Sequence, residues 1–383
     1  MRARVAALAV LFSAAVAAQG IRQVSQSGFG AFEASMVPFG DGFAVAWYDT
    51  RDGHAEIYAR LLDAAGASAG PELRLTHIDR DAYEADIAAA GANLVVVWYE
   101  VGPRSEYRAM VGSWTSDGGG LWTRQLSVEG RNGKNPVVRV SGQEILCAWL
   151  DFTAGGIPEV HAQWFDLSGQ PLGPARRVAQ AGRTTWNLNA AFDGQGRAWV
   201  AFDAKAGTQA DELFLARVEK NASQLVRLTS DDGKASKYPD IAFDAGGRAA
   251  LTWFDERDGN EEVYLFVAPV GEFKEGLESG ALRVTDTAGA STGAYLAWNG
   301  GRIGLAWNDD TLGQDEIYFE PFDADGQALA PAKRLTDNPS YSLIPAIRPA
   351  GDGFALAWNE FSPGPAGGHD PRGRSEVAFT LAR

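Results

Sequence analysis

Apolar runs that end in an aromatic residue recur along the chain at nearly constant spacing. The run from Phe43 to Trp47 is one example, and an apolar residue stands two positions before each repeated aromatic, as a β-strand with one buried face requires. The repeated aromatic residues are Trp47, Trp98, Trp149, Phe202, Trp253, Trp307 and Trp358. They lie 51, 51, 53, 51, 54 and 51 residues apart, so one structural unit is copied seven times.

Each unit contains four predicted strands, which we call A to D in chain order. Strand A is a short apolar stretch such as 239–243 or 345–347, and a glycine-rich turn such as 244–247 separates it from strand B, the run that ends in the aromatic residue. Strand C begins at a glutamate, and strand D has the Arg-Leu-Thr type of residues 74–76. The glutamates are Glu56, Glu106, Glu159, Glu212, Glu262, Glu316 and Glu376. Four strands in about 50 residues predict a β-propeller blade.

The two ends of the chain predict how the ring closes. The seventh unit has strands A to C but no strand D, whereas residues 21–25 resemble a strand D that precedes the first unit. If this N-terminal strand completes the last blade, no sheet edge stays unpaired. We therefore expect an all-β fold, a seven-bladed β-propeller of four-stranded blades closed by the N-terminal strand.

The first 18 residues are typical of a secretory signal peptide. Arg2 and Arg4 precede an apolar run from Val5 to Val16, and the small residues Ala17 and Ala18 follow it. We expect cleavage after Ala18 and a single propeller domain over residues 19–383. No cysteine lies near the cleavage site to carry a lipid anchor, and no later segment has the roughly 20 apolar residues of a transmembrane helix. The sequence therefore predicts a secreted or periplasmic protein that does not insert into a membrane.

The charge and the cysteine content restrict the possible partners. The formal net charge of −15 becomes −17 when Arg2 and Arg4 leave with the signal peptide. Such a surface repels nucleic acid, so a glycan or a protein is the expected ligand and nucleic acid is not. One cysteine forms no intramolecular disulfide, and four histidines make a dedicated metal centre improbable. We expect a monomer with no metal and no cofactor.

One hairpin carries a motif of a known group of propellers. The segment 115–122, Thr-Ser-Asp-Gly-Gly-Gly-Leu-Trp, matches the Asp-box pattern and is placed between strands C and D of the second unit. The chain thus resembles the secreted bacterial sialidase-like Asp-box repeat propellers. In this motif the aspartate caps turn amides and the tryptophan packs inside the blade, so the motif is structural. The arginine motif of true sialidases is absent, so the resemblance transfers no catalytic residue.

Residues that recur in every unit are interpreted as structural. Chemistry happens once in a protein whereas packing happens in every blade, so the seven glutamates are expected to hydrogen-bond a neighbouring loop or blade. The repeated tryptophans are expected to fill the space between blades. Cys147 replaces Val or Leu of the other units and is expected in the core.

Candidate binding residues lie where units depart from the consensus, in the B–C and D–A loops of one face. Arg51 and Arg257 stand in near-identical B–C loops that are either ligand sites or Asp-Gly turns with an ion pair, the turns being favoured. Trp186 with Arg183 offers the most sugar-like pair, an aromatic platform beside a planar donor. The complete candidate set is Arg51, His77, Arg80, Tyr83, Arg183, Trp186, Asn187, Arg257, His369 and Arg372.

The sequence leaves three classes of function open. The preferred hypothesis is an exported binding module that recognises a glycan or a protein through loops on one face. The alternative is an extracellular carbohydrate-active enzyme, either a sialidase-like glycoside hydrolase or a polysaccharide lyase. A structural hub in an envelope assembly is the third. No catalytic residue is assigned.

Overall fold

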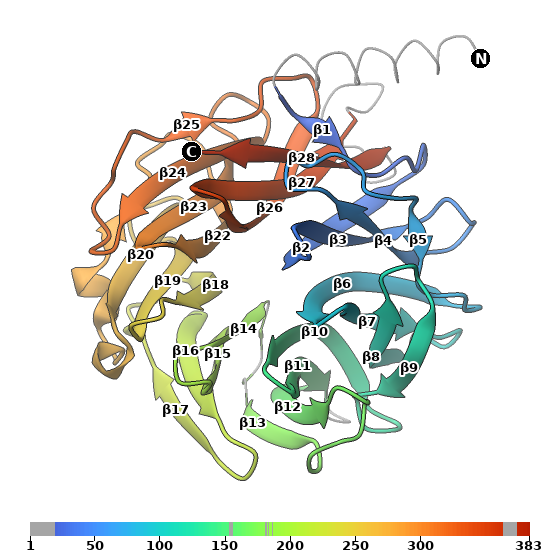
Figure 1. Cartoon of the computed structure of the whole chain (residues 1–383). Coiled ribbons are helices and arrows are strands. Elements are labelled where there is room, and N and C mark those ends of the chain that lie inside the picture. The colour runs from blue at the N-terminus through green and yellow to red at the C-terminus, as the bar shows by residue number, and fades with distance from the viewer. Residues whose placement is uncertain (1–19, 153–155, 181, 183, 186, 363–373) are drawn as a thin grey trace.

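The computed structural model describes residues 20–152, 156–180, 182, 184, 185, 187–362 and 374–383. Seven antiparallel sheets of four strands each stand around a central axis (Figure 1). The predicted fold class, a seven-bladed β-propeller, is confirmed. No helix in these residues is long and apolar enough to cross a membrane.

The blades follow one another along the chain. Blade 1 contains β2 (Ala31–Phe39), β3 (Gly42–Asp49), β4 (Glu56–Leu62) and β5 (Leu73–Arg74). Blade 2 contains β6 (Asp81–Ala90), β7 (Asn93–Val101), β8 (Tyr107–Thr115) and β9 (Gly120–Gln125). Blade 3 contains β10 (Asn132–Ser141), β11 (Glu144–Phe152), β12 (Pro158–Asp166) and β13 (Arg176–Gln180). Blade 4 contains β14 (Leu188–Phe192), β15 (Ala198–Ala204), β16 (Glu212–Val218) and β17 (Ser223–Arg227).

The remaining blades include the closure. Blade 5 contains β18 (Ser236–Phe243), β19 (Arg248–Asp255), β20 (Glu262–Pro269) and β21 (Leu282–Arg283). Blade 6 contains β22 (Ser291–Asn299), β23 (Arg302–Asp309), β24 (Glu316–Asp323) and β25 (Lys333–Arg334). Blade 7 contains β26 (Tyr341–Ala350), β27 (Gly353–Phe361), β28 (Ser375–Ala382) and β1 (Arg22–Gln23). Two short 3₁₀ turns, η1 (Val270–Glu272) and η2 (Leu277–Gly280), precede β21.

The N-terminal strand closes the ring as the sequence predicts. Arg22 pairs with Phe379, and the amide of Val24 donates to the carbonyl of Val377 at 2.7 Å. Ile21 and Val24 are buried against this last blade. In Figure 1, β1 lies alongside β28, so the closure of three strands plus one is confirmed.

The repeated tryptophans fill the space between blades, also as predicted. Trp47 of blade 1 is fully buried and packs with Ala355 and Phe379 of blade 7. Trp98 of blade 2 packs in the same way against Ala46 of blade 1. Cys147 is fully buried in the cluster between blades 2 and 3, as expected of a core residue.

The glutamate at the start of strand C fastens the following D–A loop. Glu56 accepts hydrogen bonds from the Thr76 hydroxyl, from the amide of Ile78 at 3.0 Å and from the Arg74 guanidinium at 2.7 Å. Glu376 does the same for the closure, because it accepts from the amides of two N-terminal residues, Ser27 and Gly28. Glu56 and Glu376 therefore have the structural role expected of this position, whereas Glu106 departs from it, because it accepts from the amide of Arg104 in its own B–C loop at 3.0 Å.

The C–D hairpin of blade 2 has the hydrogen bonds expected of its motif, with one difference. Asp117 accepts from the Thr115 hydroxyl and from the amide of Gly119 at 3.3 Å. The Trp122 side chain does not pack inside its own blade. It lies at the boundary with blade 3, where its ring stacks on Phe165 and its Nε1 donates to the carbonyl of Leu167 at 3.1 Å.

The innermost strands are longer than the apolar stretches that predicted them. β18 begins at Ser236 and β26 at Tyr341, whereas the sequence placed these strands at 239–243 and 345–347. The first residues of these strands include polar side chains that face the channel, so they carry no apolar signal. The candidate site is built from these residues.

Candidate functional site

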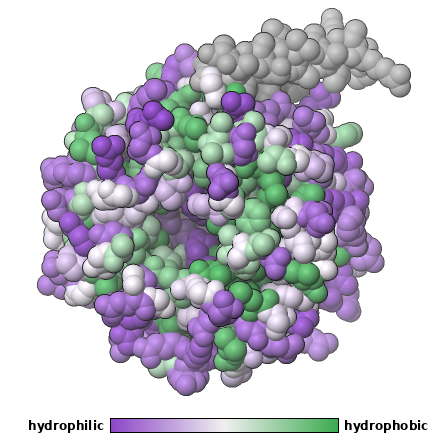
Figure 2. Space-filling model, viewed as in Figure 1, coloured by the Kyte–Doolittle hydropathy of each residue, from purple (hydrophilic) through white to green (hydrophobic). Residues whose placement is uncertain are grey.

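The ring is hollow at its centre, with hydrophilic surface in the depth of the hollow (Figure 2). One cavity of about 290 Å³ is lined by residues near the first ends of the innermost strands. These ends follow the D–A loops, so the cavity opens on the face that carries the D–A and B–C loops. This is the face on which the sequence places the binding site.

The rim of this cavity is built from a backbone irregularity that recurs around the ring. In blade 1 the register of β2 on β3 shifts between Phe32 and Ser35, and the corresponding shift occurs in five other blades. The residue within the bulge has a left-handed backbone, and its side chain lines the cavity in five blades. These residues are Glu33 (φ 54°), Glu84 (φ 54°), Asn135 (φ 48°), Tyr238 (φ 55°) and Ile344 (φ 57°). Conformations of this kind cost energy and cluster at functional sites.

Two carboxyl groups from neighbouring blades meet at this rim. Burial, and secondly the nearby charge of Glu84, raise the pKa of Glu33 to about 8. Burial raises the pKa of Glu84 to about 7, although Lys134 opposes the shift. Glu33 Oε2 is buried without a hydrogen-bond partner among the described residues. At neutral pH the pair therefore retains a proton, and it offers one hydroxyl donor beside carboxylate acceptors.

Aromatic rings border the carboxyl pair. Phe32 stacks on Tyr48 with centroids 5.0 Å apart, Tyr48 meets the edge of Tyr83 at 5.0 Å, and Tyr83 packs on Tyr99 at 5.7 Å. Burial raises the pKa of Tyr48 and of Tyr99, and the nearby charges of Glu33 and Glu84 add to the shift. These phenols therefore remain neutral donors near the rim. Across the cavity, Tyr238 stacks on Phe254 at 5.4 Å.

The floor of the cavity is a chain of charged and amide groups that crosses from blade to blade. Asp86 accepts from Ser35 Oγ at 2.7 Å and from Arg139 Nη1 at 2.6 Å. Arg139 Nη2 donates to Asn189 at 2.5 Å, and Asn189 donates in turn to Asp240. This chain divides the channel, because Arg139 lines both this cavity and a second one beyond it.

Two predicted site residues lie at or near this cavity. Asn187 lines it directly. Tyr83, which the sequence placed in a D–A loop, lies instead in strand β6 next to Glu84, where its ring packs on Tyr48 and Tyr99 without lining the cavity. The correction has a simple cause, since the polar start of an innermost strand looks like a loop in the sequence.

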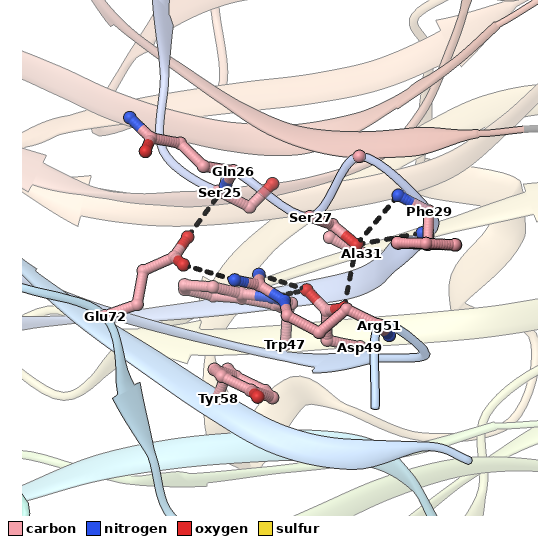
Figure 3. A network of polar contacts seen from close by, with 12 residues as sticks. Ser25, Gln26, Ser27, Phe29, Ala31, Trp47, Asp49, Arg51, Tyr58 and Glu72 are labelled. Carbon is pink, nitrogen blue, oxygen red and sulfur yellow. Dashed lines mark hydrogen bonds and ion pairs between the residues drawn. The ribbon is translucent and has the colours of Figure 1, made fainter. Parts of the chain in front are cut away.

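Arg51 and Arg257 are each held by an ion pair to the last residue of the strand before their B–C loop, and Arg51 also pairs with Glu72, which precedes β5. Arg51 contacts Asp49 and Glu72 at 2.5 Å each, and its guanidinium lies 4.5 Å above the centre of the Tyr58 ring (Figure 3). Arg257 repeats this arrangement with Asp255 and Tyr264. Asp49 and Asp255 are both buried, so each of these B–C loops is a turn held by an ion pair.

The other predicted residues fall outside the cavity lining or outside the described residues. Arg80 lies near Glu100, with 3.7 Å between Nη1 and Oε2, and His77 is exposed on the same loop. Arg183, Trp186, His369 and Arg372 lie outside the residues that the structure describes.

Sequence reasoning missed Glu33, Glu84 and Tyr238. A signal for them existed, because Glu33 and Glu84 are 51 residues apart at the same position of two units, where later units have Asn135 or Tyr238. The site thus differs between blades at one structurally equivalent position. Within the described part of the chain, no group of three or more His, Cys, Asp or Glu side chains is arranged to hold a metal ion.

No protein-family model matches the chain, and no curated protein matches it either. Solved structures match by fold. A puromycin-hydrolysing peptidase of Mycobacterium tuberculosis is 14% identical with a TM-score of 0.57, over 89% of this chain and 51% of the peptidase, so the chain spans about half of that protein. The phage phi92 endosialidase is 9% identical with a TM-score of 0.53, over 95% of this chain and 68% of the endosialidase. A PL25 ulvan lyase is 10% identical with a TM-score of 0.51, over 83% of each chain. At these identities the likeness shows the fold alone.

Proposed function

We propose that this protein is an exported glycan-binding propeller whose ligand occupies the cavity on the D–A and B–C face. The observation that carries the proposal is the carboxyl pair of Glu33 and Glu84 at the rim, bordered by tyrosines and by the amides of Asn135 and Asn187. Hydroxyl groups of a sugar need both donors and acceptors, and this rim supplies both. Aromatic rings next to polar groups suit the apolar faces of a pyranose ring.

The charge of the molecule restricts the class of glycan that can bind. The net charge of −15 and the acidic rim oppose a polyanion, so a neutral or amino-bearing glycan is favoured. Among the fold neighbours above, the PL25 ulvan lyase is named a polysaccharide lyase, which agrees with a glycan ligand.

A specific observation also favours a second candidate function, glycoside hydrolysis. Glycosidases use one carboxylic acid with a raised pKa and a second carboxylate that acts as base or nucleophile. Glu33, with its pKa raised to about 8, has the property of the acid, and Glu84 is the partner carboxyl. In this reaction Glu33 would protonate the leaving-group oxygen while Glu84, directly or through water, attacks the anomeric carbon.

The experiment compares binding and turnover on the same glycans. The protein is tested on a broad glycan array, each hit is titrated, and products are analysed by mass spectrometry. We expect Glu84→Gln and Tyr238→Ala to weaken binding of a hit about tenfold or more, as loss of a central contact does. Arg248→Gln, which breaks an exposed ion pair with Asp325 and lies outside the cavity lining, is the matched control.

The outcomes separate the candidates. Binding without products supports the binding module, and hydrolysis that Glu33→Gln abolishes supports the glycosidase. Unsaturated products indicate a polysaccharide lyase and contradict the hydrolytic role of Glu33. Failure to bind any glycan, or binding that survives both cavity variants, overturns the proposed site.

A further inference from the structure

The opposite mouth of the channel contains a second cavity with a different character. It has a volume of about 370 Å³ and lies where the innermost strands end. Its walls are mainly apolar and include Phe192, Phe243, Leu296 and Trp298. This space is large enough to hold several waters, which an apolar ligand would displace favourably.

The floor of this second cavity presents one guanidinium that has spare donors. Arg348 lines both cavities and donates from Nη1 to the carbonyl of Ile347 at 2.7 Å. It forms no ion pair within 4.0 Å and no other hydrogen bond in the described part of the chain. A guanidinium has five N–H donors, so most of those of Arg348 are available to a ligand.

The neighbouring charged groups are already satisfied. Arg139 donates to Asp86, to Asn189 and to the carbonyls of Val138 and Ala190. Both oxygens of Asp240 are occupied, one by Asn189 and one by the amide of Leu296 at 2.9 Å. Burial and the positive charge of Arg139 lower the pKa of Arg348, and the charges of Asp86 and Asp240 oppose this shift without cancelling it, so the charge of Arg348 is only partly compensated. An additional anion next to Arg348 would compensate the positive charge of its guanidinium.

The two mouths are not equivalent routes for such an anion. From the first cavity it would pass the carboxyl groups of Glu33 and Glu84. From the second cavity it would pass apolar walls, with Asp240 as the acidic lining residue among those described. The route with less like-charge repulsion is therefore the apolar mouth.

We infer that the apolar mouth binds a small amphipathic carboxylate, such as a medium-chain fatty acid, with its carboxylate on Arg348 and its apolar tail between Phe192, Phe243 and Trp298. A planar guanidinium binds a carboxylate through two parallel hydrogen bonds, which gives the head group its specificity. The tail supplies affinity in proportion to the apolar area that it buries. This site opens on the mouth opposite to the glycan cavity, shares Arg348 with the lining of that cavity, and does not depend on the proposed function.

Titration calorimetry with octanoate tests the inference. We expect octanoate to bind more tightly than hexanoate, because the longer tail buries two more methylene groups. 1-Octanol and octylamine, which have the same tail without the negative charge, are expected to bind about tenfold or more weakly, the loss of one charge-assisted contact.

Substitutions at two positions test the placement. Ala242 lines the second cavity but not the first, so Ala242→Phe fills the apolar mouth without changing any charge. It is expected to abolish octanoate binding and to leave glycan binding unchanged. Arg348→Gln is expected to reduce the affinity for octanoate about tenfold or more and to remove the preference for octanoate over octanol. Arg348→Lys keeps a positive charge, so it should retain part of the affinity and part of the preference.

Asp325→Asn, on an exposed hairpin, is the control that should leave octanoate binding unchanged. Equal binding of octanoate and octanol, or octanoate binding that survives Ala242→Phe, overturns the inference. Because Ala242→Phe leaves Arg348 in place, the test remains decisive if an Arg348 variant does not fold.

Discussion

Glu33 and Glu84 occupy the same position in neighbouring blades, 51 residues apart, each with a backbone φ of 54° at the bulge of an innermost strand. The repeat therefore places two carboxyl groups at the channel mouth, where burial favours the protonated form of both and the charge of Glu84 adds to the effect on Glu33. At this position, which faces the cavity, the blades carry different residues, among them Glu33, Asn135 and Tyr238.

The carboxyl pair should make stability depend on pH. The folded protein holds a proton on Glu33 up to about pH 8, whereas the unfolded chain releases it near the ordinary glutamate value of about 4.3. Stability therefore falls as pH rises between these values, by up to about 1.4 kcal/mol per pH unit for each such proton. Other buried acids with raised pKa, such as Glu212 and Glu360, act in the same direction.

We expect the double variant Glu33→Gln/Glu84→Gln to be more stable than the parent at pH 8 and similar to it near pH 4. The measurement is urea denaturation from pH 4 to 9, and the difference between the two proteins should grow with pH. Parallel pH profiles would show that these carboxyl groups are ionised in the folded state.

The B–C loop arginines should matter for stability more than for binding. Removing Arg51 leaves Asp49 buried and charged without its partner, so Arg51→Gln is expected to lower the free energy of unfolding by about 2 kcal/mol or more. Arg257→Gln should lower the free energy of unfolding by a similar amount, because it leaves Asp255 without its partner. Arg248→Gln, which breaks an exposed pair with Asp325, is the control and should change stability by about 0.5 kcal/mol or less.

The contribution of the Asp49–Arg51 ion pair to stability depends on pH with the opposite sign to that of the Glu33 and Glu84 pair. Burial alone would raise the pKa of Asp49. Hydrogen bonds from Arg51, Ser27 and Trp47 outweigh burial, so the pKa of Asp49 is lowered overall. Its contribution is therefore present above the unfolded value of about 3.9 and is lost as the pH falls below that value. The destabilisation by Arg51→Gln should shrink in acid, and a destabilisation that is constant down to pH 2 would mean that packing, not charge, is responsible.

The closure by β1 should be required for cooperative folding. Val24 is buried against blade 7, so Val24→Asp is expected to cost about 3 kcal/mol or more, because it buries a charge without a partner. Arg22→Glu on the exposed side of the same strand should have little effect. The measurement is the thermal unfolding midpoint of each variant. Equal decreases for Val24→Asp and Arg22→Glu would contradict the claim that the N-terminal closure stabilises the protein.

Cys147 should be unreactive until the protein unfolds. Burial, and secondly the charge of Asp86, raise the pKa of its thiol far above neutrality, so neither access nor thiolate is available. An aromatic disulfide reagent should label no thiol in the native protein and one per chain in denaturant. Rapid labelling of the native protein would show that the boundary between blades 2 and 3 opens.

The fold followed from the sequence because its signals repeat. Trp47 and its six counterparts mark a buried strand in every unit, and a seven-fold repetition outweighs local ambiguity. The missing strand D at the C-terminal end and the strand-like residues 21–25 were sufficient to predict the closure, since an open ring would expose a sheet edge.

The site did not follow from the sequence, for two physical reasons. Glu33 and Tyr238 belong to β-strands, but their bulged, channel-facing positions interrupt the alternation that identifies strands, so the sequence indicated loops there. They are also 205 residues apart, and only ring closure brings them to one cavity. Candidates were therefore sought in loops, where Arg51 and Arg257 proved to be held in ion pairs.

The most direct test of the central claim is a crystal structure of the protein with the oligosaccharide that binds it most tightly. We expect a sugar ring in the cavity on the D–A and B–C face, with hydroxyl groups hydrogen-bonded to Glu33 or Glu84 and a ring face near Tyr238. Sugar bound at equivalent sites between all blades, or on the outer edges of the ring with the cavity empty, would contradict the claim.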